Sequence, residues 1–78
     1  MVYYPYMATK DQVNRRKELG DKLRNVREHA GQTQAQVAEA AGLNTNYYAR
    51  IERGEENPSF EKLQNIMKAL KIKSLDLL

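Results

Sequence analysis

The sequence predicts an all-α protein built from five helical segments. Apolar residues recur at mostly helical spacing in each long segment, and no segment shows the sustained alternation of apolar and polar residues that marks a half-buried strand. Glycine, proline and residues that favour helix caps stand between these segments. A chain of 78 residues is long enough for one domain with one small core.

A capping box predicts where the first helix begins. Thr9 is followed three residues later by Gln12, and apolar residues then continue the helical pattern over about residues 10–30. Gly20 lies inside this segment, where it costs roughly 1 kcal/mol relative to alanine. We therefore expect either that the first turns fray or that the backbone approaches another element closely at Gly20.

Two short helices are predicted next. Thr33 and Gln36 form a second capping box, and the helix that they begin ends at Gly42, since glycine readily takes the left-handed backbone conformation. Asn44 can cap a third helix, which ends at Gly54 in the position that favours glycine just past a helix. Each of these helices has only about two turns.

A break in the chain separates the third helix from the last two. Pro58 prevents helix continuation and Ser59 can cap a fourth helix. The predicted apolar face of that helix consists of Phe60, Leu63, Ile66, Met67 and Leu70. Ser74 is predicted to cap a final turn that contains Leu75, Leu77 and Leu78.

Composition and charge narrow the function classes. The chain has no cysteine and a single histidine, His29, so it lacks the residues for a disulfide or a metal site, and no nucleophile is paired with a base. No apolar run reaches membrane-spanning length and no signal peptide opens the chain. Residues 1–31 hold the whole net charge of +3, which fits either a polyanionic partner or a solvated helix face. We expect a cytoplasmic protein that is not an enzyme and needs no cofactor.

The second and third predicted helices together form a helix-turn-helix unit. The small side chain of Ala38 lets the two helices cross closely, and Gly42 makes the turn between them. Leu43, Tyr48 and Ile51 are expected to fill the space at the crossing. The combination of these residues at these spacings is far more specific than a glycine between two helices.

The segments that carry this pattern are "LGDKLRNVREHAG", "TQAQVAEAAGLNTNYYARIERGEENPS" and "LQNIMKALKIKSLDLL". In them the chain resembles the Cro/phage-repressor-like helix-turn-helix family of the xenobiotic-response-element type. The likeness covers about residues 19–78, and "RIERGEENPS" is its most specific part. It implies a compact five-helix lambda-repressor-like DNA-binding domain over residues 10–78, usually dimeric. The small size resembles a restriction-modification controller protein or a small phage regulator.

Three polar residues of the third helix are the candidates for base recognition. Thr45, Asn46 and Arg50 lie opposite the inward-facing Tyr48 and Ile51, near the helix end that can reach base edges. Arginine can pair with guanine and asparagine with adenine, whereas threonine offers a hydroxyl or a methyl group. The alternative is that these residues form an ordinary solvated helix face.

Contacts to DNA phosphates and a structural ion pair follow from the resemblance. Gln34 matches a family position at which a glutamine and a helix N-terminus meet a phosphate. Further predicted phosphate contacts are Tyr47, Arg53 and Asn57, although packing is an alternative for Tyr47. The resemblance also places Arg27 beside Glu52 as a structural ion pair. The chain departs from the family pattern at two places. Gln32 stands where a leucine commonly packs, and the loop residues Glu55 and Glu56 are acidic at positions that could face phosphates.

The predicted function is a sequence-specific transcriptional regulator that binds a pseudopalindromic operator as a homodimer and competes with, or recruits, RNA polymerase. The predicted dimer interface consists of Ile72, Leu75, Leu77 and Leu78, which could instead cover the core of the monomer. An antitoxin with autoregulatory DNA binding is the alternative, and a protein-binding adaptor is a third. Residues 1–9 are predicted to form an N-terminal arm. Its residues Tyr3, Tyr4 and Tyr6 could touch DNA, pack against a neighbouring surface or be disordered.

Overall fold

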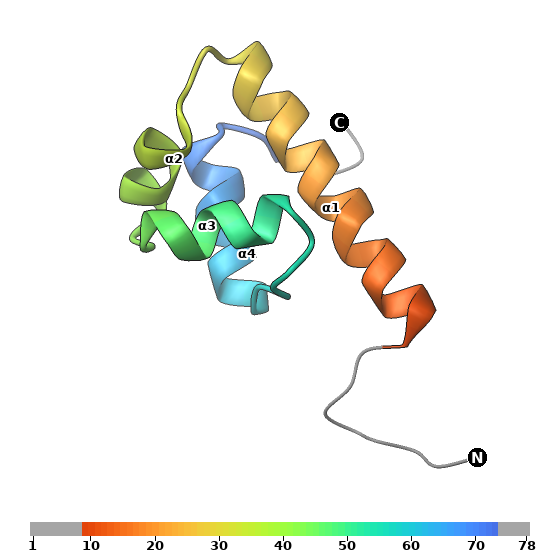
Figure 1. Cartoon of the computed structure of the whole chain (residues 1–78). Coiled ribbons are helices and arrows are strands. Elements are labelled where there is room, and N and C mark those ends of the chain that lie inside the picture. The colour runs from red at the N-terminus through yellow and green to blue at the C-terminus, as the bar shows by residue number, and fades with distance from the viewer. Residues whose placement is uncertain (1–8, 74–78) are drawn as a thin grey trace, which may run out of the picture.

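The computed structural model describes residues 9–73, and four α-helices lie in that part of the chain. Figure 1 shows their arrangement. They are α1 (Lys10–His29), α2 (Gln34–Ala41), α3 (Thr45–Glu52) and α4 (Phe60–Ala69). These bounds confirm the all-α fold and the first four predicted helices.

Two predicted segments lie outside the described residues. One is the fifth helical turn, which was expected to begin at Ser74 and to contain Leu75, Leu77 and Leu78. The other is the N-terminal arm as far as residue 8, with Tyr3, Tyr4 and Tyr6. The described range thus contains four of the five predicted helices. None of these four has both the length and the apolar character that a membrane-crossing helix requires.

Both predicted capping boxes are formed. The Thr9 hydroxyl accepts a hydrogen bond from the Gln12 backbone N–H at 3.1 Å, and the Gln12 side-chain oxygen accepts one from the Thr9 N–H at 2.8 Å. Thr33 and Gln36 repeat this exchange at the same two distances. Each box satisfies two helix N–H groups that would otherwise lack partners, which fixes where α1 and α2 begin.

The turn between α2 and α3 also follows the sequence signals. Gly42 caps α2 with φ of 71°, a left-handed conformation that a side chain would strain. Two residues later, the Asn44 side-chain oxygen accepts hydrogen bonds from the N–H groups of Asn46 at 2.8 Å and Tyr47 at 3.2 Å. This cap fixes the first turn of α3, which holds two of the predicted base-contact residues.

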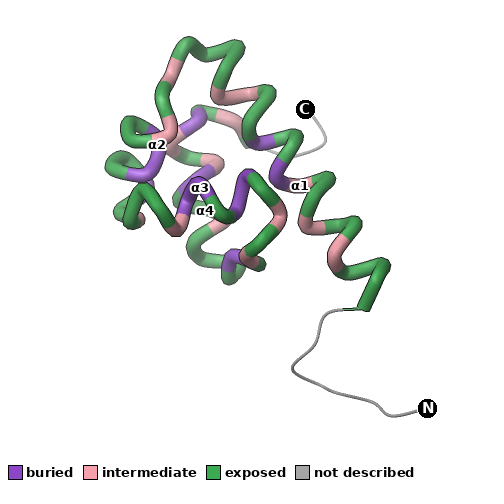
Figure 2. Tube along the Cα trace, viewed as in Figure 1, coloured by how far each residue is buried: buried purple, intermediate pink, exposed green. Residues whose placement is uncertain are grey.

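The core lies where α2, α3 and α4 meet the C-terminal half of α1. α2 packs against both α3 and α4, and α1 packs against α3. Figure 2 shows buried positions gathered at this junction, whereas the first turns of α1 extend past it and contain no buried residue. The core cluster consists of Leu23, Val37, Ala38, Ala41, Tyr48, Ile51, Ile66 and Leu70.

One predicted core residue is exposed. Phe60 was expected on the apolar face of α4, but 75% of its surface is accessible to solvent. The helical repeat of 3.6 residues places Phe60 roughly 90° from the face formed by Leu63, Ile66 and Leu70. Burial along this helix therefore begins with Leu63, which is partly buried, and is complete at Ile66.

Close helix packing, not fraying, accounts for the glycine inside α1. Gly20 is buried against the last turn of α3. A Cβ atom at this position would lie 2.6 Å from the Ile51 carbonyl oxygen and closer still to that of Glu52. Both atoms belong to backbone that cannot rotate away, so only glycine lets the two helices approach this closely.

Replacing this glycine tests the contact. Gly20→Ala should destabilise the protein by about 1–3 kcal/mol, because the clash with α3 exceeds the gain in helix propensity. The free energy of unfolding, measured by urea denaturation, checks this. Asn14→Ala is the matched control, since Asn14 is an exposed position of the same helix and should lose no stability. A Gly20→Ala protein as stable as the parent would show that the helices do not pack this tightly.

Candidate nucleic-acid interface

The helix α3 has one buried face and one exposed polar face. Tyr48 and Ile51 are fully buried in the core. Thr45, Asn46 and Arg50 are all exposed on the other side of the helix. The structure thus places the three predicted base-contact residues together on one accessible surface. Their role in reading bases remains a prediction.

A buried carboxylate at the end of α3 joins three helices. Glu52 is only 3% exposed, and its two oxygens accept hydrogen bonds from Arg27 of α1, at 2.7 Å from Nε and 3.1 Å from Nη2. The side-chain amide of Gln34, at the start of α2, donates a third hydrogen bond at 3.0 Å. Arg27 also donates from Nη1 to the backbone oxygen of Gln32 at 2.9 Å. The ion pair that the family resemblance implied is therefore present, and it ties α1, α2 and α3 together.

The protonation states around Glu52 follow from these contacts. Burial by itself raises the pKa of the Glu52 carboxyl, but hydrogen bonds from Arg27 and Gln34 outweigh burial and hold that pKa below its usual value. The hydrogen-bonded carboxylate in turn raises the pKa of Arg27. Burial also raises the pKa of the Tyr48 phenol. Its hydroxyl faces the Glu52 carboxylate but forms no hydrogen bond with any residue between positions 9 and 73. The group at neutral pH is therefore a charged pair beside a neutral phenol.

The predicted phosphate contacts occupy different settings. Gln34 is half-buried because its amide is engaged with Glu52, although it still lies at the N-terminus of α2. Arg53 and Asn57 are exposed in the segment after α3. Tyr47 packs partly against the core, with the Lys62 ammonium 4.7 Å above its ring centre. This contact supports the packing alternative for Tyr47.

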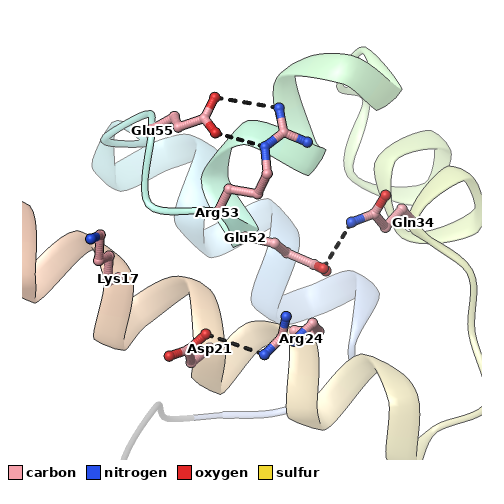
Figure 3. A pocket seen from close by; sticks show the side chains of 7 residues that line it. All are labelled: Lys17, Asp21, Arg24, Gln34, Glu52, Arg53 and Glu55. Carbon is pink, nitrogen blue, oxygen red and sulfur yellow. Dashed lines mark hydrogen bonds and ion pairs between the residues drawn. The ribbon is translucent and has the colours of Figure 1, made fainter.

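An open hollow of about 420 Å³ lies between α1 and the end of α3. Figure 3 shows Gln34 and Arg53 on one side of it and three charged residues of α1 on the other. Those three are Lys17, Asp21 and Arg24. Arg24 pairs with Asp21 at 3.4 Å. No group of three or more His, Asp or Glu residues between positions 9 and 73 is arranged to hold a metal ion.

The acidic loop residues contact two of the predicted DNA-binding arginines. Arg53 donates to the Glu55 carboxylate at 2.7 and 3.4 Å, and Arg50 lies 3.7 Å from the Glu56 carboxylate. The Glu55 contact raises the pKa of Arg53 and lowers that of Glu55. Both arginines therefore carry neighbouring negative charge on the surface predicted to face DNA.

Comparison with known families identifies this arrangement. A helix-turn-helix domain model matches residues 18–78, which is most of the chain. The chain belongs to the helix-turn-helix domain family. Within this helix-turn-helix domain, α2 and α3 supply the two helices of the motif and the Gly42 turn connects them.

Related proteins are transcriptional regulators by name. The domain is 39% identical over 57 residues to the transcriptional regulator ClgR of Mycobacterium tuberculosis, covering 73% of this chain and 51% of the relative. It is 39% identical over 54 residues to the immunity repressor protein of Bacillus phage phi105, covering 69% of this chain and 38% of the relative. The chain thus spans about half or less of these relatives.

Solved structures share the fold. The restriction-modification controller protein C.AhdI from Aeromonas hydrophila superposes with a TM-score of 0.76 at 30% identity, over 77% of this chain and 91% of that one. The clp gene regulator ClgR from C. glutamicum gives a TM-score of 0.72 at 34% identity, over 78% of both chains. The four described helices therefore have the arrangement of known helix-turn-helix regulators.

Sequence reasoning missed the contribution of α1 to the surface of this helix-turn-helix domain. Lys17 and Arg24 line the hollow beside Gln34 and Arg53, yet no motif in the sequence indicates either residue. The available signal was the positive charge of residues 1–31, which could not single out a residue. Only the packing of α1 against α3 brings these two side chains beside the predicted phosphate contacts.

The depressed pKa of Glu52 predicts how stability depends on pH. A carboxylate whose pKa is lower in the folded state stabilises the protein above its unfolded pKa of about 4.3, and this contribution is lost as the pH falls through the folded value. Glu52→Gln should cost about 3 kcal/mol at neutral pH because it strands the Arg27 charge. The difference from the parent should shrink below about pH 4.3. Urea unfolding between neutral and acidic pH measures both effects.

Glu18→Gln is the control for this measurement. Glu18 is exposed, lies two residues before Gly20 and thus on the far side of α1, and forms no ion pair within residues 9–73. Its replacement should change the free energy of unfolding by less than about 0.5 kcal/mol at every pH. A Glu52→Gln effect that is absent at neutral pH, or that stays constant into acid, would contradict the assigned role.

Proposed function

We propose that this helix-turn-helix domain binds double-stranded DNA sequence-specifically and regulates transcription without enzymatic activity. The observation that carries the proposal is the seating of α3: its apolar side is buried and its end is held by Glu52, while Thr45, Asn46 and Arg50 remain exposed. Relatives named as regulators and repressors support the same conclusion. The α3 helix is therefore proposed to enter the major groove.

Each exposed residue of α3 suits a different base edge. The guanidinium of Arg50 can donate two hydrogen bonds to guanine, and the amide of Asn46 can exchange two with adenine. Thr45 can offer its hydroxyl to a base or its methyl group to thymine. These three side chains are proposed to read one short half-site.

Contacts to the sugar-phosphate backbone would set the position of α3 in the groove. Gln34 lies at the N-terminus of α2, where backbone N–H groups and the helix dipole favour a phosphate. Arg53 and Asn57 supply further exposed polar groups after α3, and Tyr47 is partly exposed. Such contacts carry no sequence information by themselves.

A homodimer is proposed because one short half-site discriminates poorly in a genome. Each mismatched base pair costs only roughly 1–3 kcal/mol, so two copies of α3 are needed for adequate specificity. Ile72 packs partly against the core of its own chain, and the apolar residues Leu75, Leu77 and Leu78 follow it in the sequence. We assign the dimer interface to this region. Bound near a promoter, the dimer would compete with or recruit RNA polymerase.

Selection of bound duplexes from a random DNA pool tests the proposal directly. The selected sequences should share a pseudopalindrome whose half-sites lie about 34 Å apart, one turn of B-DNA, because two copies of α3 would enter successive major grooves. A pool that yields no common sequence, although the protein binds DNA, would contradict sequence-specific recognition. A single unrepeated half-site would contradict the dimer.

Variants of two arginines separate base reading from phosphate contact. Arg50→Ala should relax the preference at one operator position and cost about 1–3 kcal/mol of binding free energy there. Arg53→Gln should weaken binding to all duplexes alike and leave the base preference unchanged. Fluorescence anisotropy with the selected duplex and its single-base variants measures both. Equal losses on every duplex for Arg50→Ala would remove this residue from base recognition.

A further inference from the structure

Two acidic residues lie where they can occupy the DNA-binding arginines. Glu55 and Glu56 directly follow Gly54, and their carboxylates are the partners of Arg53 and Arg50. The Arg53 guanidinium uses Nε and Nη2 together toward Glu55, as a fork binds a carboxylate or a phosphate. Figure 3 shows this pair at the edge of the hollow that also contains Gln34.

The backbone holds these acids beside the arginines. The Glu55 N–H donates to the Arg50 carbonyl oxygen at 2.8 Å, and the Gly54 N–H donates to that of Ile51 at 3.0 Å. This pair of hydrogen bonds is the Schellman motif that closes a helix, and Gly54 takes the left-handed conformation that the motif requires, with φ of 77°. The place of the acidic loop is therefore set by the end of α3.

We propose that Glu55 and Glu56 are intramolecular competitors of DNA for Arg53 and Arg50. The inference rests on the proposed function, because it concerns the same surface. A guanidinium paired with a carboxylate has to exchange it for a phosphate or a base edge when DNA binds. Both pairs are about half exposed to solvent, so DNA can displace them, but they lower the affinity for DNA until it does.

The competition has a defined consequence for binding to arbitrary DNA. Binding without sequence preference depends almost entirely on cations that neutralise phosphates. An Arg53 that is paired with Glu55 adds less to this attraction than a free arginine would, and the Glu55 charge repels the DNA backbone. The acidic loop thus reduces the fraction of protein held at random sites.

Replacement of Glu55 tests the inference on DNA of random sequence. The full chain carrying Glu55→Gln should bind a short labelled random duplex about two- to fivefold more tightly than the parent. Its affinity should also depend more steeply on salt, by up to about 0.9 in the logarithmic slope, since one more arginine becomes available to a phosphate. Fluorescence anisotropy across a salt series measures both quantities.

A double-mutant cycle identifies the target of the acid. In an Arg53→Gln background, Glu55→Gln should give a smaller gain, because the repulsion from the carboxylate is still removed but no guanidinium is released. The Glu56→Gln and Arg50→Gln pair should behave in the same way. Glu18→Gln removes the same charge from the far side of α1, so its effect on affinity should stay below about 1.5-fold at moderate salt.

The possible results separate this inference from the proposed function. An equal gain for Glu55→Gln with and without Arg53, or an equal gain for Glu18→Gln, would show a general charge effect and overturn the inference. Unchanged affinity of the Glu55→Gln and Glu56→Gln variants, with the parent bound to DNA, would overturn the inference alone. Absence of DNA binding by the parent and by every variant would contradict the proposed function itself.

Discussion

The buried Glu52 carboxylate is the constraint on which the presentation of α3 depends. A charge that is 97% shielded from water is tolerated only when its oxygens are hydrogen-bonded, and Arg27 and Gln34 supply those bonds from two other helices. All three helices therefore have to be in place at once. The close approach of α1 and α3 at Gly20 serves the same arrangement, because it brings the last turn of α3 within reach of Arg27.

The shortness of α3 explains why such a constraint is needed. An isolated helix of eight residues has little stability in water, so its orientation has to come from tertiary contacts. The Asn44 cap fixes its beginning, Tyr48 and Ile51 anchor its buried face, and Glu52 fixes its end. A helix held at three points presents its exposed side chains in a defined geometry, which lowers the entropy cost of recognition.

Signals between residues close in the sequence predicted the helices well, but they could not predict contacts between residues far apart in the sequence. The caps at Thr9, Thr33 and Asn44 are exchanges between residues two or three apart, so their spacing alone was sufficient. The choice between fraying and close approach at Gly20 required α3 to be placed. Phe60 is exposed because its position on the helix lies away from the buried face of α4, although the apolar pattern of the segment assigned it to that face.

In the candidate interface, too, some features could be predicted from the sequence and others required the folded structure. The outward position of Thr45, Asn46 and Arg50 could be predicted from helical spacing, because the apolar residues between them define the opposite face. The Arg27–Glu52 pair required the family resemblance, since 25 positions separate the two residues. The pairing of the loop acids with the arginines, and the place of Lys17 beside them, could be seen only once the backbone was folded.

The most direct test of the account is a structure of the protein bound to a duplex selected from random DNA. The account predicts Thr45, Asn46 and Arg50 within hydrogen-bond distance of base edges, with the Arg27–Glu52 pair unchanged; a complex in which α3 faces away from the duplex would contradict it.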